Sequence, residues 1–533
     1  MIKIVWFIIL TSILNSQELY LHPYWLKLLH YKNGESQIDD FHFFLSKIGK
    51  ISPKDELLAT LKAIKIDNPQ DANSTQCIFP ARTRWLKNML PKDNIQECKS
   101  LVQKLRELDF KKVYIVYASS FMNSPASAFG HTFLRFDNSF DTPLLSYGVT
   151  YSAKIDTHNI LSYIYRGVLG GFEGRYNIAL YYSIVNRYSN IQSRDIWEYR
   201  LKFTPQEIEK MTLHIIEMQR FYSDYYFNSK NCSYNLLWFI DLARDDLRFS
   251  GEFNDIVTPL DIIKALKASN LIDKVTLRAS KITKIKALYQ SIEKKEIAQQ
   301  FYNNPNISLI EKLSTEEQRD ILDLRILKKS SSELLSYRSK LGVSQTKKIV
   351  KTDPTYANLA SKLNLSIFNR QLLYGIRVAY HDIFDIDYDF NLGEYITFFD
   401  IQMLNSRLNS INFLKIDSLA IIDELYHPIS WGLDIGYQED RLYIQTKVGI
   451  SFSPYNSLIF YEPTINLSNN IELGYEMGFL KSINKVKFGA IIKRKFSNKI
   501  DRDFFITYQF DKNMAINIYR YNSKYSFGLF YYF

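Results

Sequence analysis

The last third of the chain alternates apolar residues with polar residues or glycine, from about residue 361 to residue 533. The stretch IELGYEMGF, residues 471–479, shows the pattern: Ile, Leu, Tyr, Met and Phe occupy the odd-numbered positions, and Glu and Gly occupy the even-numbered ones. Successive side chains of a β-strand point to opposite faces of the sheet. A period of two therefore predicts strands that have one apolar face and one polar face.

Twelve segments with this alternation follow one another within about 170 residues and are joined by short turns. They are, in chain order, SKLNLSIFN, LLYGIRVAY, YITFFDIQML, INFLKIDSLA, SWGLDIGYQ, RLYIQTKVGISF, SLIFYEPTINL, IELGYEMGF, VKFGAIIKRKF, FFITYQF, MAINIYR and YSFGLFYYF. Runs of about ten alternating residues, rich in Tyr and Phe, are typical of a transmembrane β-barrel. A water-soluble barrel or sandwich would alternate in the same way, with its apolar face turned inward.

Two features favour the membrane barrel over the soluble one. Charged residues gather on the polar face, where a wet lumen accepts them. They are Glu472, Glu476, Lys487, Lys493 and Lys495. The chain also ends on Phe533, in phase with the apolar face, and a C-terminal aromatic residue resembles the insertion signal of bacterial outer-membrane proteins. We therefore expect an antiparallel transmembrane β-barrel of about 12 strands over residues 358–533.

The N-terminal segment MIKIVWFIILTSILNSQ carries one positive charge, Lys3, followed by an apolar run from Ile4 to Leu14 and small or polar residues up to Ser16. This is the form of a secretory signal peptide, and the run is too short to span a bilayer comfortably. An uncleaved amphipathic or core helix is the alternative. We expect residues 1–16 to be a signal peptide that exports the chain, and no later stretch is apolar enough for a transmembrane helix.

The chain between these two segments divides into three parts. Residues 17–110 have helical patterns and indicate an α-rich module. Residues 111–259 begin with short aromatic and β-branched segments, KKVYIVYASSF, HTFLRFD and LLSYGVTYSA, which predict a small antiparallel sheet. Residues 260–357 are rich in lysine and predict a solvated helical connector. The glycine-rich stretch 167–177 lacks the lysine of a phosphate loop, and we interpret it as a flexible loop over a cleft.

Two helices between residues 111 and 259 have clear start signals. The first begins after Thr204, its N-cap, with Pro205 at the first helical position and Glu207 completing a capping box. The second begins after Asn231, the expected cap of a helix that starts at Cys232.

The chain has three cysteines, Cys77, Cys98 and Cys232. In an exported protein an odd number suggests one disulfide and one free thiol. Cys77 and Cys98 lie 21 positions apart in a polar region that contains proline, which suits a local disulfide; two unpaired thiols are the alternative. Cys232 is then the thiol left over.

A cysteine at the start of a helix feels the positive end of the helix dipole, which lowers the thiol pKa and raises the thiolate fraction. Cys232 occupies that position, although most free cysteines are small buried apolar residues. A thiolate nucleophile needs a nearby base, and His131 follows Gly130 at the start of a predicted strand, where substrate can approach closely. The alternative for His131 is a structural histidine bonded at a strand end.

The other titratable residues give weaker signals. His214 and Glu217 lie inside the capped helix, and we interpret both as ordinary exposed residues. No HExxH or CxxC motif occurs, so we expect no metal ion and no cofactor. The net charge of +11 is spread over many lysines rather than gathered in a basic stripe, which argues against nucleic acid and suits a negatively charged membrane surface.

Four segments, YASSFMNSPASAFGHTFLRFD, GGFEGRYNIALYY, RDIWEY and FNSKNCSYNLL, resemble in order and spacing the Lnb family of lipoprotein N-acyltransferases. The periplasmic domain of that family is similar to a permuted papain-type thiol fold, of the α+β class. CIFPARTRWL resembles the leader of longer family members, and the barrel segment is similar to their tail. The resemblance covers residues 20–533, and its specific part runs from Tyr114 to Leu237.

The resemblance implies that His131 and Cys232 are the catalytic pair. Two positions depart from the family pattern: Thr150 stands where an asparagine is frequent, and Asn235 stands where a basic residue usually follows NCSY. A third catalytic group, which would orient the imidazole, is therefore not named.

The chemistry that the resemblance implies is attack of the Cys232 thiolate on an acyl ester of a phospholipid. A thioester forms, and the N-terminal amine of a lipoprotein then accepts the acyl chain. Backbone N–H groups at the helix start would hold the oxyanion, with Asn231, Ser233 and Gly130 as supporting residues. The catalytic domain would lie in the periplasm and the barrel in the outer membrane.

Two other classes of function stay open at this point. A thiol amidase of the cell wall, or a lipid hydrolase, would use the same pair with water as acceptor. A non-enzymatic outer-membrane channel or scaffold would need neither residue. The sequence does not indicate an oligomeric state.

Overall fold

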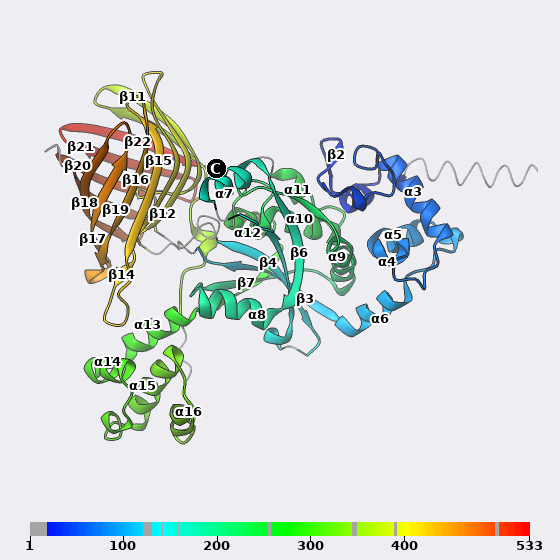
Figure 1. The fold of residues 1–533 in the computed structure, drawn as a ribbon, viewed down its shortest axis with the longest axis horizontal. Coiled ribbons are helices and arrows are strands. Elements are labelled where there is room, and N and C mark those ends of the chain that lie inside the picture. Colours follow the sequence, from blue (N-terminus) through cyan, green and yellow to red (C-terminus); the bar gives the residue numbers. More distant parts are fainter. Residues whose placement is uncertain are drawn as a thin grey trace, which may run out of the picture. The chain divides into compact units, whose positions relative to one another are not determined.

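The computed structural model describes residues 19–120, 130–140, 142–157, 159–253, 257–343, 349–387, 392–495 and 500–533 (Figure 1). The expected signal peptide, residues 1–16, lies outside the described residues. Contacts divide the chain into two compact units. The first comprises residues 1–118, 131–187 and 197–276, and the second comprises residues 119–130, 188–196 and 277–533. Within the described parts of the chain, no helix combines the length and the apolar character that a membrane span requires.

The first unit begins with a mostly helical module, as the sequence predicts. Its elements are α2 (Pro23–Leu28), β1 (Tyr31–Lys32), β2 (Glu35–Ser36), η1 (Phe41–Phe43), α3 (Pro53–Ile66), α4 (Thr75–Ile78), α5 (Pro80–Met89), η2 (Pro91–Asp93) and α6 (Lys99–Leu108). Helices α2 and α5 pack against the helices of the domain that follows. The module therefore shares a core with that domain.

A seven-stranded sheet forms the centre of the first unit, in the order β8-β6-β5-β4-β3-β7-β9. Its strands are β3 (Phe110–Ala118), β4 (His131–Asn138), β5 (Tyr147–Ala153), β6 (Phe172–Leu180), β7 (Ile196–Leu201), β8 (Tyr222–Tyr225) and β9 (Ile272–Arg278). The pairs β3–β4, β4–β5, β5–β6 and β6–β8 are antiparallel, which confirms the predicted small sheet.

Helices flank this sheet (Figure 1). They are α7 (Ile160–Leu169), α8 (Tyr181–Val185), η4 (Asn186–Ile191), α9 (Pro205–Met218), α10 (Cys232–Ala243), α11 (Phe249–Glu252) and α12 (Pro259–Ala268), with η3 (Pro143–Leu145) before β5. Helix α9 has the predicted capping box between Thr204 and Glu207. Helix α10 is buried along its whole length and packs against α9, β4 and β5. The region is thus the mixed α/β fold expected from the sequence.

The glycine-rich stretch 167–177 is not the loop that we expected. It forms the end of α7 and most of β6, and Gly170 between them has φ +79°, a left-handed conformation that closes the helix. A Cβ atom at Gly167 would lie 2.1 Å from the Phe227 ring, so this glycine leaves room for the ring to pack against α7. The glycines meet packing and turn requirements instead of conferring mobility.

The lysine-rich segment after residue 260 also differs from a solvated connector. Strand β9 joins the edge of the sheet beside β7, and Asp273 in it pairs with Arg200 of β7 at 2.7 Å. The helices that follow are α13 (Lys281–Ser291), α14 (Lys295–Asn303), α15 (Thr315–Lys328) and α16 (Ser332–Ser339), with η5 (Ile307–Leu309) and η6 (Pro354–Tyr356). They enclose a core of their own around Ile285, Phe301 and Ile321. The high lysine content suggested a solvated segment, whereas the structure has a packed helical bundle and an edge strand there.

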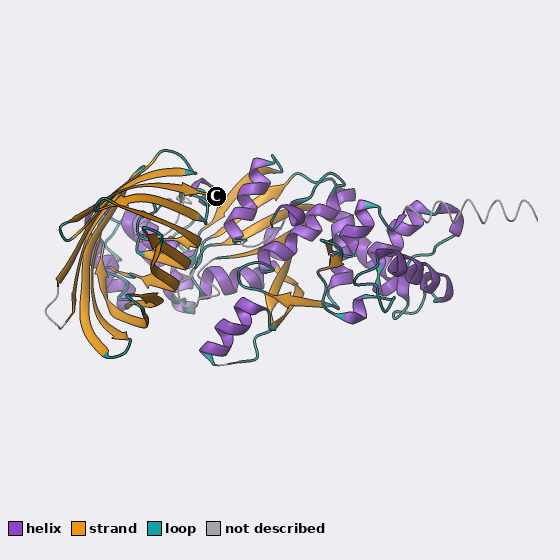
Figure 2. Ribbon diagram, turned by 90° about the horizontal axis from the view of Figure 1, so that it is seen from above, coloured by secondary structure: helices purple, strands orange, loops and turns teal. Residues whose placement is uncertain are grey.

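The C-terminal strands close into a twelve-stranded antiparallel barrel, as predicted (Figure 2). They are β10 (Lys362–Phe368), β11 (Gln371–His381), β12 (Glu394–Leu404), β13 (Arg407–Ser418), β15 (Ser430–Gln438), β16 (Arg441–Phe452), β17 (Leu458–Leu467), β18 (Ile471–Ile483), β19 (Val486–Lys495), β20 (Ile500–Gln509), β21 (Met514–Tyr521) and β22 (Lys524–Tyr532). The first strand pairs with the last, β10 with β22, and β16 pairs with β17. Two short elements lie between them, β14 (Ile421–Ile422) and η7 (Pro454–Asn456).

The outer face of the barrel is apolar and the inner face is largely polar. In β22 the exposed residues include Phe527, Leu529 and Tyr531, whereas the buried ones include Ser526 and Tyr532. A water-soluble barrel would show the reverse, with its aliphatic and aromatic side chains inward and its charges outward. The apolar exterior is the arrangement that a bilayer requires, which decides between the two alternatives.

Strand β20 follows the same rule as β22. On its outer face, Phe504 is 43% exposed and Ile506 is 52% exposed. On its inner face, Asp503, Thr507 and Gln509 are buried. Asp503, Thr507 and Gln509 therefore face the lumen, as the alternation in the sequence predicts.

Residues 382–387, which follow β11, fold into the lumen. Asp385 in this segment accepts a hydrogen bond from Tyr532 of β22 at 2.9 Å and pairs with Lys362 of β10 at 3.2 Å. Asp387 pairs with Lys487 of β19 at 2.9 Å, and β19 lies five strands from β11 around the barrel. The segment thus joins opposite walls.

Apolar packing closes the same part of the lumen. Phe384 packs against Phe505 of β20, with ring centroids 4.9 Å apart, and against Tyr519 of β21 at 5.7 Å. Further inward-facing apolar residues, among them Leu458 and Leu480, are fully buried beside it. The interior at this level is a packed core.

The filled lumen predicts that the barrel does not conduct ions as an open pore does. In planar bilayers the protein is expected to give no stepwise conductance, because the segment and its ion pairs fill the passage. Replacing Asp385 and Asp387 together with Ala removes the anchoring pairs and is expected to produce current. Asp440→Ala, at an exposed turn, serves as the control. Porin-sized current from the unaltered protein would contradict this prediction.

Candidate active site

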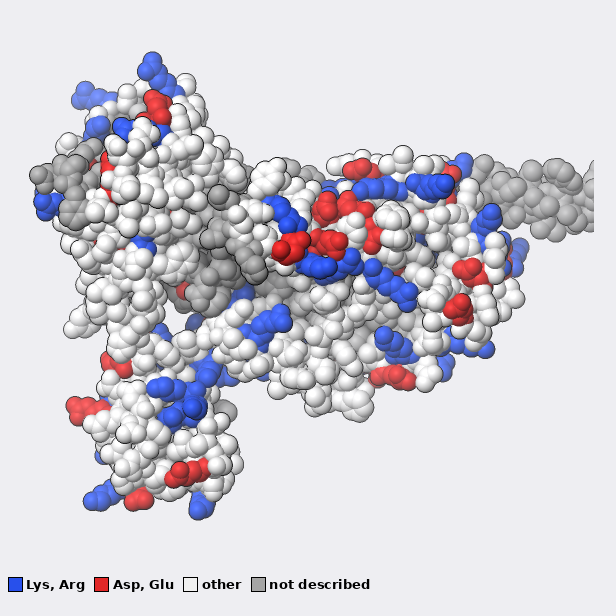
Figure 3. Space-filling model, viewed as in Figure 1, with Lys and Arg blue, Asp and Glu red and all other residues white. Residues whose placement is uncertain are grey.

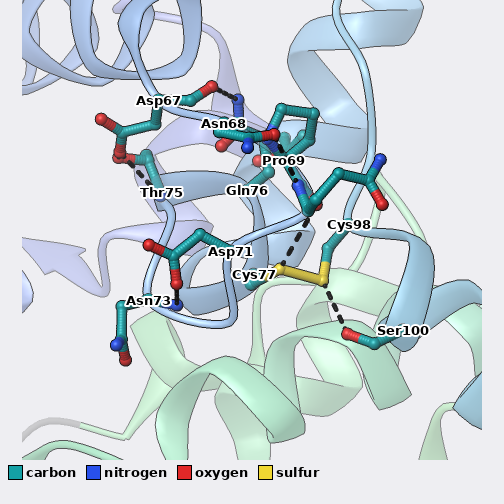
Figure 4. Close-up of a disulfide and its surroundings, with 12 residues drawn as sticks. Asp67, Asn68, Pro69, Asp71, Asn73, Thr75, Gln76, Cys77, Cys98 and Ser100 are labelled. Carbon is teal, nitrogen blue, oxygen red and sulfur yellow. Dashed lines mark hydrogen bonds between the residues drawn. A yellow bond between two sulfur atoms is a disulfide. The ribbon is translucent and has the colours of Figure 1, made fainter.

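Cys232 is the cysteine that lies outside the disulfide, because Cys77 and Cys98 are joined with an S–S distance of 2.03 Å (Figure 4). The disulfide joins α4 to the start of α6, where the Cys98 sulfur lies 3.2 Å from the Ser100 hydroxyl. Cys232 is 4% exposed and is the first residue of α10. The one thiol of the chain thus lies at a helix start.

Asn231 caps α10, as predicted, and fixes this helix start. Its side-chain oxygen accepts hydrogen bonds from the backbone N–H of Ser233 at 3.1 Å and of Tyr234 at 3.2 Å. Its side-chain nitrogen donates to the carbonyl of Val257 at 2.6 Å. Asn235 adds a second tie, since its side chain donates to the carbonyl of Lys230 at 3.1 Å. The segment that carries the thiol is therefore held from both sides.

The N–H groups at the start of α10, which we expected to hold the oxyanion, have acceptors within the protein. The N–H groups of Ser233 and Tyr234 bond to Asn231, and the N–H of Cys232 donates to the Tyr225 hydroxyl at 3.1 Å. The Ser233 hydroxyl also donates to Asn231, at 2.6 Å. Asn231 therefore forms the cap of the helix, and the oxyanion role of Asn231 and Ser233 stays a prediction.

His131 is the first residue of β4 and is partly buried. Gly130 before it has φ +84°, a left-handed conformation that favours glycine. The requirement for glycine at this position therefore comes from the backbone conformation. His131 pairs with Ala118 of β3, and its ring centroid lies 6.2 Å from that of Phe133. Residues 121–129, which include the SPASAF stretch, lie outside the described residues.

A line of tyrosines links the start of α10 to the start of β4. Tyr225, bonded to Cys232, stacks on Tyr151 of β5 with ring centroids 5.6 Å apart. Tyr151 pairs with Tyr176 of β6, whose hydroxyl donates to the Asn235 carbonyl at 2.9 Å. Because β4 and β5 are antiparallel, the end of β5, which carries Tyr151, lies at the same end of the sheet as the start of β4. The helix start and the strand start therefore lie at the same end of the sheet.

Tyr225 is a residue that sequence reasoning missed. It ends β8, seven positions before Cys232, in a stretch rich in tyrosine where no spacing rule singles it out. Burial and the neighbouring Cys232 charge raise the pKa of the Tyr225 hydroxyl well above its usual value of 10.0. The phenol therefore stays protonated and remains a hydrogen-bond donor.

The two departures from the family pattern occupy different surroundings. Asn235 holds the loop before Cys232, as described above, and its carbonyl is bonded as well. The Thr150 hydroxyl donates to the carbonyl of Asn177 at 3.5 Å, and these two residues face each other in the middle of the β5–β6 pair. Neither contact identifies the third catalytic group.

His214 and Glu217 are fully buried, contrary to our expectation of exposed residues. Glu217 accepts a hydrogen bond from Arg82 of α5 at 2.9 Å, and the His214 ring nitrogen lies 2.9 Å from that of His30. The sequence does not show this burial because it depends on α5 and α10, which pack against α9. His30 in turn stacks on Trp238 of α10, with centroids 4.6 Å apart. These side chains join the N-terminal module to the domain that carries Cys232.

The buried His30 predicts that acid destabilises the first unit. Burial, the neighbouring His214 and the Arg82 charge hold the pKa of His30 well below 6.5. Because an unfolded histidine gains its proton below about pH 6.5 and folded His30 does not, stability is full above that pH and falls by about 1.4 kcal/mol per unit below it. Thermal melts followed by tryptophan fluorescence at pH 7.5 and 5 should show a smaller pH effect in His30→Gln. The exposed His42, changed to Gln, should leave it unaltered, and equal pH effects in both variants would contradict the prediction.

Charges of both signs are interspersed over the face of the protein seen in Figure 3. This agrees with the absence of a basic stripe in the sequence. Among the described residues, no three side chains of the types His, Cys, Asp or Glu are grouped to hold a metal ion.

Comparisons with known families agree with this architecture. Residues 101–269 match the Lnb N-terminal periplasmic domain. Residues 17–89 and 351–516 match two domains of unknown function, DUF7843 and DUF7840. No curated protein matches the chain.

Several solved structures are similar to the barrel. The KdgM porin in complex with disordered oligogalacturonate has 10% sequence identity and a TM-score of 0.26, and the match covers 33% of this chain and 99% of the porin. The Acinetobacter baumannii outer membrane protein Omp33 has 12% identity and a TM-score of 0.21, and the match covers 33% of this chain and all 100% of Omp33.

The chain therefore combines a thiol-bearing α/β domain with a membrane β-barrel. More particularly, it contains an Lnb N-terminal periplasmic domain followed by a twelve-stranded outer-membrane barrel. The barrel lies in the outer membrane, as its apolar exterior requires, and the Lnb domain lies in the periplasm.

Proposed function

We propose that the protein is a cysteine-dependent acyltransferase that moves an acyl chain from a phospholipid to the N-terminal amine of a lipoprotein. The observation that carries this proposal is a thiol outside any disulfide at the start of a capped helix, at the end of the sheet where the strand of His131 begins. The match of residues 101–269 to the Lnb N-terminal periplasmic domain, a range that includes both residues, also supports the proposal. The barrel holds the domain at a membrane, where both lipid substrates are found.

The reaction divides into two acyl transfers. In the first, His131 takes the Cys232 proton, the sulfur attacks the ester carbonyl, and the lysophospholipid leaves as an alcohol that receives this proton. In the second, the lipoprotein amine attacks the thioester and gives up a proton to His131, which returns it to the sulfur. The products are an amide and the restored thiol. A thioester intermediate splits one difficult transfer into two easier ones.

The alternatives differ in the acceptor or in the need for the thiol. A lipid hydrolase or a cell-wall amidase would pass the acyl group to water from the same sulfur. A scaffold or channel would need no thiol, and the filled lumen argues against the channel. The acceptor is therefore the part of the proposal that an experiment must decide.

The test is to trap the acyl-enzyme. Purified protein is incubated with phospholipid that carries an isotope-labelled acyl chain, and the protein mass is then measured. We expect one labelled chain per protein, on the peptide of Cys232, released by hydroxylamine and transferred to a diacylated lipopeptide when one is added. Because Cys77 and Cys98 are joined, Cys232 is the available thiol. Transfer to water alone would favour the hydrolase, an adduct from cell-wall peptide would favour the amidase, and no adduct would overturn the proposal.

A further inference from the structure

The Tyr225 hydroxyl lies against the reacting residue. It accepts the backbone N–H of Cys232 at 3.1 Å, and a hydrogen bond with the Cys232 side chain contributes to the shift of its pKa. Tyr225 pairs with Phe172 of β6 and belongs to the edge strand of the sheet. A phenol oxygen that accepts one bond still has its own proton to donate.

The need for such a donor follows from the helix cap. An acyl transfer builds negative charge on the carbonyl oxygen, and enzymes stabilise this charge with donors placed in advance. The backbone donors at the start of α10 already bond to Asn231 and Tyr225. The Tyr225 O–H is a donor beside the sulfur that can still turn to a new oxygen.

We infer that Tyr225 is a further catalytic residue, whose O–H bonds to the Cys232 sulfur at rest and to the oxyanion during acyl transfer. The inference rests on the proposed function for its second part, and for its first part on the contact between the Tyr225 hydroxyl and Cys232. The bond that Tyr225 accepts from Cys232 polarises its own O–H and strengthens its donation. Because the phenol stays protonated, it transfers no proton, and the balance of the reaction is unchanged.

Among the described residues, the other ionisable groups around Tyr225 come from several elements. Cys232 belongs to α10 and Tyr151 to β5. Asp39 and Asp224 lie near Tyr151, where their charges act on its pKa. A change in the titration of Cys232 must therefore be compared with a variant that leaves these groups in place.

The test compares Tyr225→Phe with Tyr176→Phe. Tyr176 is a matched control, because its hydroxyl also bonds to the backbone of α10, one turn beyond Cys232. The first measurement is the rate of Cys232 alkylation by iodoacetamide against pH, which requires no lipid. Loss of a donor to the thiolate is expected to raise the midpoint by about one unit in Tyr225→Phe and to leave it unchanged in Tyr176→Phe. The second is single-turnover formation of the acyl-enzyme, expected to slow about 10²- to 10³-fold in Tyr225→Phe alone.

The outcomes separate this inference from the proposed function. If the unaltered protein forms no acyl-enzyme, the proposed function fails, and the alkylation profile still tests the contact between Tyr225 and the sulfur. An unchanged profile and rate in Tyr225→Phe, or equal losses in both variants, would overturn the inference. If Tyr225→Phe does not fold, 3-fluorotyrosine at position 225 replaces it. This more acidic phenol is expected to lower the alkylation midpoint, and an unchanged midpoint would equally overturn the inference.

Discussion

Cys232→Ser is expected to reduce acyl transfer by about 10³-fold or more, because a serine hydroxyl at this position lacks the acidity and the nucleophilicity of the thiol. The substitution removes no buried charge and leaves the Asn231 cap in place. The protein should therefore insert in the membrane and melt as before. Acylation of a lipopeptide by labelled phospholipid, measured in detergent, checks the result.

His131→Ala is expected to cause a similar loss, because the thiolate would lack its proton acceptor. The exposed histidine at position 42 provides the control, and His42→Ala should retain full activity. Full activity in either Cys232→Ser or His131→Ala would contradict the proposed thiol-dependent enzyme. The non-enzymatic scaffold would then be the remaining function. The melting temperature of each variant shows whether a loss of activity comes from a loss of folding.

The barrel could be predicted from the sequence almost strand by strand. Its signal is local, since every second side chain must suit either lipid or lumen, and residues such as Ile471 and Leu473 report their face directly. The inward segment around Asp385 gave no such signal. The position of Asp385 depends on Lys362, Lys487 and Tyr532, which lie 23, 102 and 147 residues away along the chain. Contacts between residues so far apart along the chain leave no periodic pattern in the sequence from which they could be predicted.

In the candidate site, too, the local features could be predicted from the sequence and the long-range contacts could not. The cap at Asn231 and the helix from Cys232 follow from local preferences, and both are present. The contact between Tyr225 and Cys232 depends on how β8 turns into the helix, and the burial of His214 and Glu217 depends on the module packed against α9. A single sequence shows which residues can take part in chemistry. The neighbouring groups that occupy their hydrogen-bond donors are determined by the fold.

Arg82→Met is expected to lower the free energy of unfolding of the first unit by about 3 to 5 kcal/mol, because it leaves two buried carboxylates without their counter-charge. Arg82 donates to Glu56 at 2.6 Å and to Glu217 at 2.9 Å, and all three side chains are fully buried. Its guanidinium also lies 4.2 Å from the ring centroids of Phe43 and Phe79. Fluorescence of the tryptophans in this module, during urea unfolding in detergent, checks the loss.

Two further variants separate charge from packing. Arg84→Ala removes an arginine from the same helix whose side chain is 30% exposed, and it should cost less than about 1 kcal/mol although Arg84 also contacts two glutamates. Arg82→Met combined with Glu56→Gln and Glu217→Gln should regain part of the stability, because no buried charge is then left unpaired. A combined variant as unstable as Arg82→Met alone would mean that the guanidinium acts through its contacts with Phe43 and Phe79. Because Glu56 belongs to the N-terminal module and Glu217 to the helix beside α10, the charge-based outcome would show that the buried arginine couples that module to the domain carrying the thiol.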